Sequence, residues 1–157
     1  TMFWNFCAQL ALYFGSVGNN FDRSMLLSVA YLIIGSAGAW KCWYRQIYYG
    51  IRDRLTVKWW IFFVFYVAHI GFCIVMCIGI QGIGAAGFSI MITAFNSQKG
   101  GTGMCCLISA IFWFLLSIAS MFQLKKSWNL YKDRGGLEQA QEEFTKAALR
   151  HAADQMV

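Results

Sequence analysis

Residues 59–83 read WWIFFVFYVAHIGFCIVMCIGIQGI and contain no Asp, Glu, Lys or Arg. A helix needs about 20 mostly apolar residues to cross roughly 30 Å of hydrocarbon, and this run is long enough. Because no water is available in lipid, the backbone of such a run must satisfy its own hydrogen bonds, as a helix does. The stretch therefore predicts a membrane-spanning helix.

Three further apolar runs lie on either side of it. Residues 25–43 carry no charge before Lys41, and residues 104–124 carry none at all. The first run is the shortest, and Asn5 and Gln9 interrupt it. We predict an all-α integral membrane protein with a four-span domain over residues 1–124. Its spans are expected at about 1–17, 25–43, 59–83 and 104–124.

The composition agrees with a membrane environment. Charged residues make up 13% of the chain and hydrophobic ones 59%, against roughly 25% and 45–50% in soluble domains. The net charge of +6 could suggest nucleic acid, but the Lys and Arg residues gather beside apolar runs. That placement favours anionic lipid. The six cysteines lie in or beside apolar runs and lack the spacing of a disulfide framework.

The distribution of Lys and Arg predicts the orientation, because cytosolic connections carry the excess of positive charge. Two connections hold a single cation each, Arg23 and Lys99. The other two regions are rich in cations: Lys41, Arg45, Arg52, Arg54 and Lys58 between the second and third spans, and Lys125, Lys126, Lys132 and Arg134 after the fourth. We therefore expect both termini in the cytosol, and luminal loops at about 18–24 and 84–103.

Two segments outside the spans have a helical pattern. In the 84–103 loop, the spacing of Phe88, Met91, Ile92 and Phe95 predicts a short helix on the luminal surface, followed by a flexible return at 99–103. After the fourth span, residues 125–157 form a cytosolic tail in which Gly135 and Gly136 break the chain. A helix is predicted from Leu137 to about Gln155. Its narrow apolar stripe consists of Leu137, Ala140, Phe144 and Ala148.

The basic connection at 40–55 is predicted to be an amphipathic helix. At 100° per residue, one arc holds Trp40, Trp43, Tyr44, Ile47, Ile51 and Leu55, and another face holds Lys41, Arg45, Tyr48 and Arg52. Such a helix can lie in the membrane interface, with its rings in the acyl boundary and its cations among the headgroups. The alternative is an ordinary cytosolic loop whose charges only set the topology.

Residues 42–48, Cys-Trp-Tyr-Arg-Gln-Ile-Tyr, resemble the Cys-Trp-Tyr-Arg-Pro-aliphatic-Tyr motif between the second and third spans of the secretory carrier-associated membrane proteins. The segment Leu130-Tyr131-Lys132, then Gly135-Gly136 and residues 139–144, is similar to that family's post-membrane segment. Gln46 departs from the usual proline. The family's Asn-Pro-Phe repeats are absent from this chain.

The resemblance implies a protein of Golgi, post-Golgi and endosomal recycling carriers and the plasma membrane, which acts in vesicle trafficking and exocytosis. It implies phosphoinositide binding by the segment between the second and third spans, and trafficking or fusion proteins as partners. Adding Lys41 and Arg52 from the basic face, the candidate lipid-binding residues are Lys41, Trp43, Tyr44, Arg45, Ile47, Tyr48 and Arg52. Cys42 is the candidate for palmitoylation.

Two other functions remain open. A tetraspan scaffold could organise membrane proteins through small residues such as Gly35, Gly38, Ala39, Gly71 and Gly79, which would also suit homo- or hetero-oligomers. A small oligomeric channel would have to use the few polar points in the spans, namely Asn5, Gln9, His69 and Gln81. No catalytic constellation is visible, so we expect no enzyme activity and no cofactor. His69, Cys73 and Cys77 are too extended along a helix to bind one metal, and none is expected.

Overall fold

The computed structural model describes residues 1–17, 21–53 and 56–154, and no strand occurs among them. The elements, in order, are α1 (Met2–Gly15), α2 (Phe21–Ala39), the π-helical turn η1 (Trp40–Tyr44), α3 (Arg45–Asp53), α4 (Thr56–Ile78), α5 (Phe88–Asn96), α6 (Gly100–Asp133) and α7 (Gly136–Asp154). The all-helical fold predicted from the sequence is confirmed.

Three helices of the described chain are long and apolar enough to cross a membrane: Asp22–Asp53, Thr56–Ile78 and Gly100–Asp133. They correspond to the second, third and fourth predicted spans. The first predicted span, α1, has 14 residues, which is only about 21 Å of helix. The count of four spans therefore stays a prediction.

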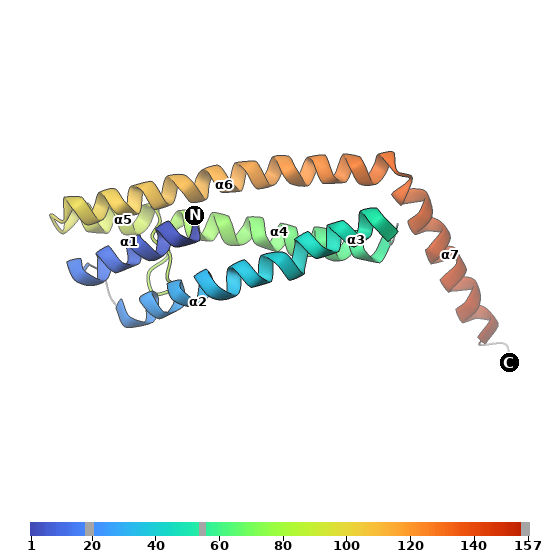
Figure 1. Cartoon of the computed structure of the whole chain (residues 1–157), viewed down its shortest axis with the longest axis horizontal. Helices are drawn as coiled ribbons and strands as arrows, with labels where there is room; N and C mark the ends of the chain where they lie inside the picture. Colours follow the sequence, from blue (N-terminus) through green and yellow to red (C-terminus); the bar gives the residue numbers. More distant parts are fainter. Residues whose placement is uncertain (18–20, 54–55, 155–157) are drawn as a thin grey trace.

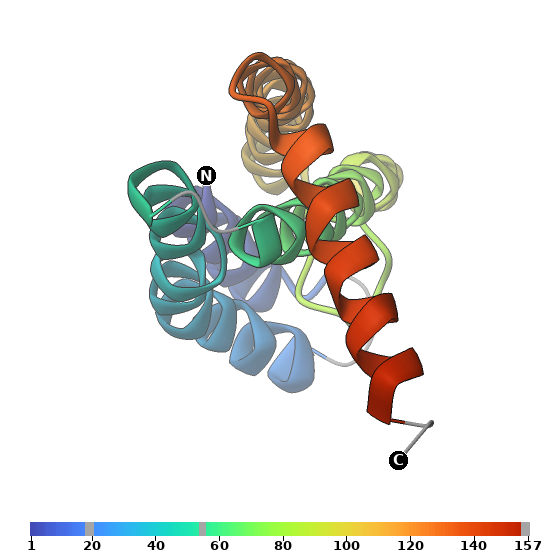
Figure 2. The same ribbon diagram turned by 90° about the vertical axis from the view of Figure 1, so that its right-hand side faces the viewer.

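The long helices form an elongated bundle (Figure 1). The helix formed by α2, η1 and α3, together with α4 and α6, runs along its length, and α1 and α5 pack at one end. At the other end, α7 leaves α6 at a steep angle and crosses the end of the bundle (Figure 2). The C-terminal end of α3, the start of α4 and the α6–α7 junction all lie at that end.

Helices α4 and α6 pack closely because small residues line their contact. Cys73 of α4 and Ala110 and Ser117 of α6 are buried, and Cys77 Sγ lies 3.6 Å from the carbonyl oxygen of Ala110. Small side chains let helix backbones approach in lipid, where van der Waals contact replaces the hydrophobic effect as the driving force. The fully buried ring of Trp113 fills the space beside them.

Helix α4 ends at Ile78, five residues before the predicted end of the third span at residue 83. Gly79 takes a φ of 79°, in the left-handed region, and ends the helix. The following loop turns into the bundle, where Ala85 and Ala86 are fully buried. Asn5 of α1 holds it: Nδ2 donates to the Gly84 carbonyl at 2.8 Å, and Oδ1 accepts from the Ala86 N–H at 3.0 Å.

The short helix in the 84–103 segment exists as α5, but with a different inner face. Ile90 and Ala94 are buried against α1 and α6, whereas Phe88, Ile92 and Phe95 of the predicted face are exposed. The predicted flexible return is wrong, because Gly100 begins α6. Gly103 is buried in that first turn, and a Cβ there would stand 3.0 Å from the ring of Phe95. The glycine permits close packing of α5 on α6.

The amphipathic segment is not separated from the second predicted span. Residues 40–53 continue α2 (Figure 1) and pack lengthwise on the start of α4. Residues 54–55, which include Leu55 of the predicted apolar arc, lie outside the described residues, as do residues 18–20 of the first loop and 155–157 of the tail.

The junction of α6 and α7 is fixed by one aromatic ring. Gly135 has a φ of 72°, and the Tyr131 hydroxyl donates to the Gly136 carbonyl at 2.7 Å. A Cβ on Gly136 would clash with the Tyr131 ring. The Gly135-Gly136 break thus sets the direction in which α7 leaves the bundle.

We expect Gly136→Ala to loosen this junction. The added methyl group must displace the buried Tyr131 ring, and overpacking of this kind costs roughly 1–3 kcal/mol. Hydrogen exchange of the first turn of α7 should accelerate accordingly. Gly101→Ala is the control, because a Cβ there meets nothing within 4 Å. Equal exchange in the two variants would contradict the role of the ring.

Candidate membrane-interface site

The candidate site is the outer face of α3, at the end of the bundle where α7 crosses. Its cations and rings sit on a helix whose inner face is fully engaged. Ile47 and Ile51 pack against a buried, mainly aromatic cluster made of Trp59, Phe62, Phe63, Tyr66, Ile70 and Tyr131. Because this inner face is held by α4, the opposite side chains are presented outward on a rigid support.

Two arginines converge on the ring of Tyr49. The Arg45 guanidinium carbon lies 5.4 Å from the Tyr49 ring centre, and that of Arg52 lies 4.6 Å from it. Arg52 also stands 5.5 Å from the ring of Tyr48. These distances are within the reach of cation–π attraction. The arrangement gathers two cations over two phenol rings on one face of one helical segment.

Asp53 modifies this cluster. Arg52 donates to both of its carboxylate oxygens, at 2.6 and 2.9 Å. Hydrogen bonding to Arg52 lowers the pKa of the Asp53 carboxyl, and hydrogen bonding to Asp53 raises the pKa of Arg52. The pair is exposed, so water screens it strongly. Arg45, in contrast, forms no salt bridge with a described residue, which leaves it the stronger positive point of the face.

The structure divides the predicted apolar arc into two sets. Trp43 points inward, with its ring centre 4.6 Å from that of His69 on α4. Trp40 and Tyr44 point outward and stack on each other, with centres 6.3 Å apart, and Tyr44 is 60% exposed. Trp43 and Ile47 thus act as packing residues here, while Tyr44 and Tyr48 lie at the surface.

The division is explained by the π-helical turn. The Arg45 N–H bonds to the carbonyl of Trp40, five residues back, so the turn holds an extra residue and rotates the side chains of α3 relative to those of α2. Gln46, at the position of the usual proline, donates from Nε2 to the Lys41 carbonyl at 3.3 Å. Lys41 is exposed. Cys42 is half-buried and lines the groove between α2 and α4.

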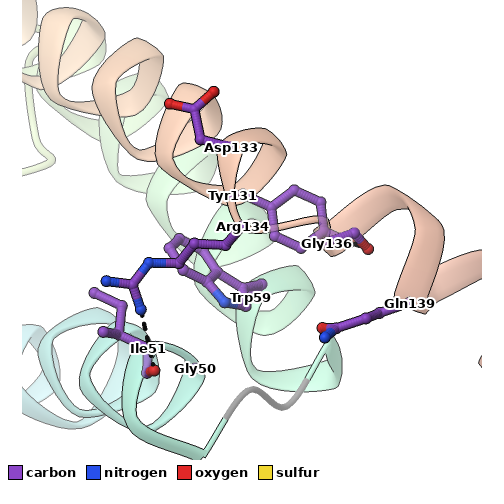
Figure 3. Close-up of a pocket in the computed structure, with 8 residues that line it drawn as sticks. All are labelled: Gly50, Ile51, Trp59, Tyr131, Asp133, Arg134, Gly136 and Gln139. Carbon is purple, nitrogen blue, oxygen red and sulfur yellow. Dashed lines mark hydrogen bonds between the residues drawn. The ribbon is translucent and has the colours of Figure 1, made fainter.

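A pocket of about 340 Å³ lies between the end of α3 and the start of α7 (Figure 3). Arg134, which follows the last residue of α6, donates to the Ile51 carbonyl at 3.3 Å. Trp59 and Tyr131 form one wall, and Gln139 projects toward the space from α7. Arg134 therefore ties the C-terminal end of α3 to the α6–α7 junction.

Sequence reasoning missed three residues of this region: Tyr49, Asp53 and Arg134. For Tyr49 a signal was present, because it lies four residues after Arg45 and three before Arg52, spacings at which helical side chains meet. Asp53 is adjacent to Arg52 in the chain. Arg134 reaches α3 across 83 residues, and no local pattern indicates such a contact.

His69 and the neighbouring thiols were the other constellation considered. His69 Nε2 lies 3.6 Å from Cys73 Sγ, within α4. Across the described residues, no group of three metal-ligating side chains comes together. His69 and Cys73 thus form a side-chain contact within α4.

Comparison with known proteins agrees with the motif at residues 42–48. Secretory carrier-associated membrane protein 2 of Homo sapiens is 30% identical over 147 residues, covering 93% of this chain and 44% of the human protein. Secretory carrier-associated membrane protein 5 of Danio rerio is 29% identical over 138 residues, covering 87% and 58%. Secretory carrier-associated membrane protein 2 of Arabidopsis thaliana is 26% identical over 155 residues, covering 96% and 53%.

The chain thus spans about half the length of these relatives. No solved structure matches it significantly. A model of the SCAMP family matches residues 1–134, which is most of the chain. The chain belongs to the secretory carrier-associated membrane protein family.

Proposed function

We propose that this protein acts in the trafficking of secretory and recycling carriers by binding anionic phosphoinositides with the outer face of α3. The observation that carries the proposal is the cluster of Arg45 and Arg52 over Tyr48 and Tyr49. Each cation near an anionic surface is worth on the order of 1 kcal/mol. Phenol rings suit the headgroup layer, where one edge is apolar and the other hydrated.

The positions of the cations support a cytosolic, headgroup-level site. The start of α4 and the C-terminal end of α6 lie at the same end of the bundle as α3. They carry Lys58, Lys125, Lys126 and Lys132, and Arg134 follows α6 directly. With α1 as a fourth span, both termini would be cytosolic, and this end of the bundle would face the anionic leaflet. Exposed Trp40 and Trp60 would sit at the interface beside it. Cys42 stays the candidate acylation position.

A scaffold that organises other membrane proteins is the competing function. It predicts that changes on α3 alter partner binding and leave lipid affinity unchanged. The small oligomeric channel predicts a flux that responds to His69 or Gln81 instead. Measurement of lipid affinity therefore separates the proposed function from both.

We expect Asp53→Asn to tighten phosphoinositide binding by about fivefold. The change removes a negative charge and frees Arg52, a gain of roughly 1 kcal/mol near an anionic headgroup. The measurement is a titration of the protein in phosphatidylcholine nanodiscs with a short-chain phosphatidylinositol bisphosphate. Salt should reduce the gain, because screening shortens the range of exposed charges.

Asp22→Asn provides the matched control. Asp22 is also exposed, but it lies in the first turn of α2, at the opposite end of that long helix. It should leave the affinity unchanged. An equal gain in both variants would mean that the lipid responds to net charge alone, and an absence of gain at Asp53 would argue against the α3 face.

A further inference from the structure

Helix α7 presents an unpartnered apolar stripe outside the bundle. It contacts α6 and α4 near its start and then projects away (Figures 1 and 2). Of its stripe, Phe144 is 77% exposed and Leu137 is 41% exposed. Ala140 and Ala148 complete the stripe at spacings of three and four residues. A stripe this narrow is typical of the seam between two paired helices.

The charge of α7 argues against the bilayer as the surface that covers the stripe. The chain has a net charge of +6, yet four of its seven acidic residues lie in α7: Glu138, Glu142, Glu143 and Asp154. Near anionic headgroups these carboxylates are repelled, whereas membrane-surface helices are rich in Lys and Arg. The stripe is therefore suited to a protein surface.

The charges beside the stripe are self-complementary. Glu143 precedes Phe144 at one edge of the stripe, and Arg150 follows Glu143 by seven residues, which is the same position one heptad later. In an antiparallel pair of such helices, Glu143 of each copy meets Arg150 of the other. A parallel pair would not bring these two residues together.

The symmetry of two copies in one membrane also favours an antiparallel pair of α7 helices. Two copies in one bilayer share their orientation, so a two-fold axis between them runs along the membrane normal. Because α7 crosses the end of the bundle at a steep angle to its long axis (Figures 1 and 2), that axis relates α7 to its copy as antiparallel helices. We propose that α7 is a self-association element, which pairs antiparallel with α7 of a second copy.

The pairing is weak by construction. A helix of 19 residues is about 28 Å long, so the seam between two copies of α7 is short. It becomes effective where carriers concentrate the protein in a small membrane area, since tethered sites meet at high effective concentration. This association uses α7 alone and is independent of lipid binding by α3.

The test uses full-length chains carrying donor or acceptor fluorescent proteins at the C-terminus, reconstituted together in phosphatidylcholine vesicles. Wild-type chains should show energy transfer above that of a dilute, unpaired reference. Glu143→Arg alone and Arg150→Glu alone should each abolish it, because like charges then face each other. Donor chains with Glu143→Arg mixed with acceptor chains with Arg150→Glu should recover the transfer, because one chain then carries a cation and the other a carboxylate at both contacts.

Glu142→Arg is the control for charge, because Glu142 lies on the outer side of α7, where it pairs with Lys146 of its own helix at 3.5 Å. It should leave the transfer intact. Phe144→Ser should abolish it. Transfer that survives Glu143→Arg and Phe144→Ser would overturn the proposal. The proposal would also fail if Phe144→Ser released α7 from the vesicle surface but left the energy transfer intact. That outcome would assign the stripe to the membrane.

Discussion

Replacing Arg45 and Arg52 together by alanine should weaken phosphoinositide binding by about thirtyfold. Two cations near an anionic surface contribute roughly 2 kcal/mol, which corresponds to that factor in affinity. Arg45 should supply more of the loss than Arg52, because Asp53 already neutralises part of the Arg52 charge. The measurement is titration of the nanodisc-embedded protein with short-chain phosphatidylinositol bisphosphate at two salt concentrations.

The bundle should stay folded in this double variant. Arg45 and Arg52 are exposed, and their contacts are to the Tyr48 and Tyr49 rings and to Asp53 on the same helix. Arg23→Ala with Lys99→Ala is the matched control. It removes the same charge from exposed positions that precede the apolar parts of α2 and α6, and the affinity should not change. Wild-type affinity in the Arg45/Arg52 variant would rule out the proposed lipid site and leave only the family and its fold.

The structure also decides which aromatic residue can test lipid contact. Trp43→Ala would empty a space between α2 and α4, because the Trp43 ring packs against Tyr66 and His69. A loss of binding there would report damage to the fold. Tyr44 is the better position, since it is exposed and contacts mainly Trp40.

The spans could be predicted because lipid imposes a simple rule, a long run without charge. Their ends depend on tertiary contacts, which the rule does not contain. Residues 79–83 are apolar enough to continue α4, but Gly79 turns the chain. The Asn5 side chain then hydrogen-bonds to two backbone groups of the loop, which a longer helix would have paired within itself. In the sequence, Asn5 counted only as an interruption of the first run.

The candidate site was predicted in composition more than in geometry. The helical projection of residues 40–55 placed Trp40, Trp43 and Tyr44 on one arc because it assumed a rotation of 100° for every residue. The π-helical turn over these residues changes that rotation and sends Trp43 inward and Trp40 outward. The sequence gives little warning of a π turn, and the inner face of α3 can be assigned only once α4 is seen against it.

Asn5→Ala should produce the largest loss of stability of any single change considered. The substitution leaves two buried backbone groups, the Gly84 carbonyl and the Ala86 N–H, without their partners. Each unpaired buried group costs roughly 1–3 kcal/mol, so the free energy of unfolding should fall by about 2–6 kcal/mol. Denaturant unfolding in detergent micelles, followed by tryptophan fluorescence, measures the change.

Gln9→Ala separates the hydrogen bonds from the volume of the amide. Gln9 is also buried and lies one turn along the same helix, but its Nε2 contacts no acceptor among the described residues. Its removal loses packing without leaving a backbone group unpaired, so the cost should be clearly smaller than for Asn5→Ala. Equal losses in the two variants would mean that Asn5 only fills space. A larger loss for Asn5, with faster hydrogen exchange at Ala86, would identify its side chain as the anchor that draws the 79–87 loop into the bundle.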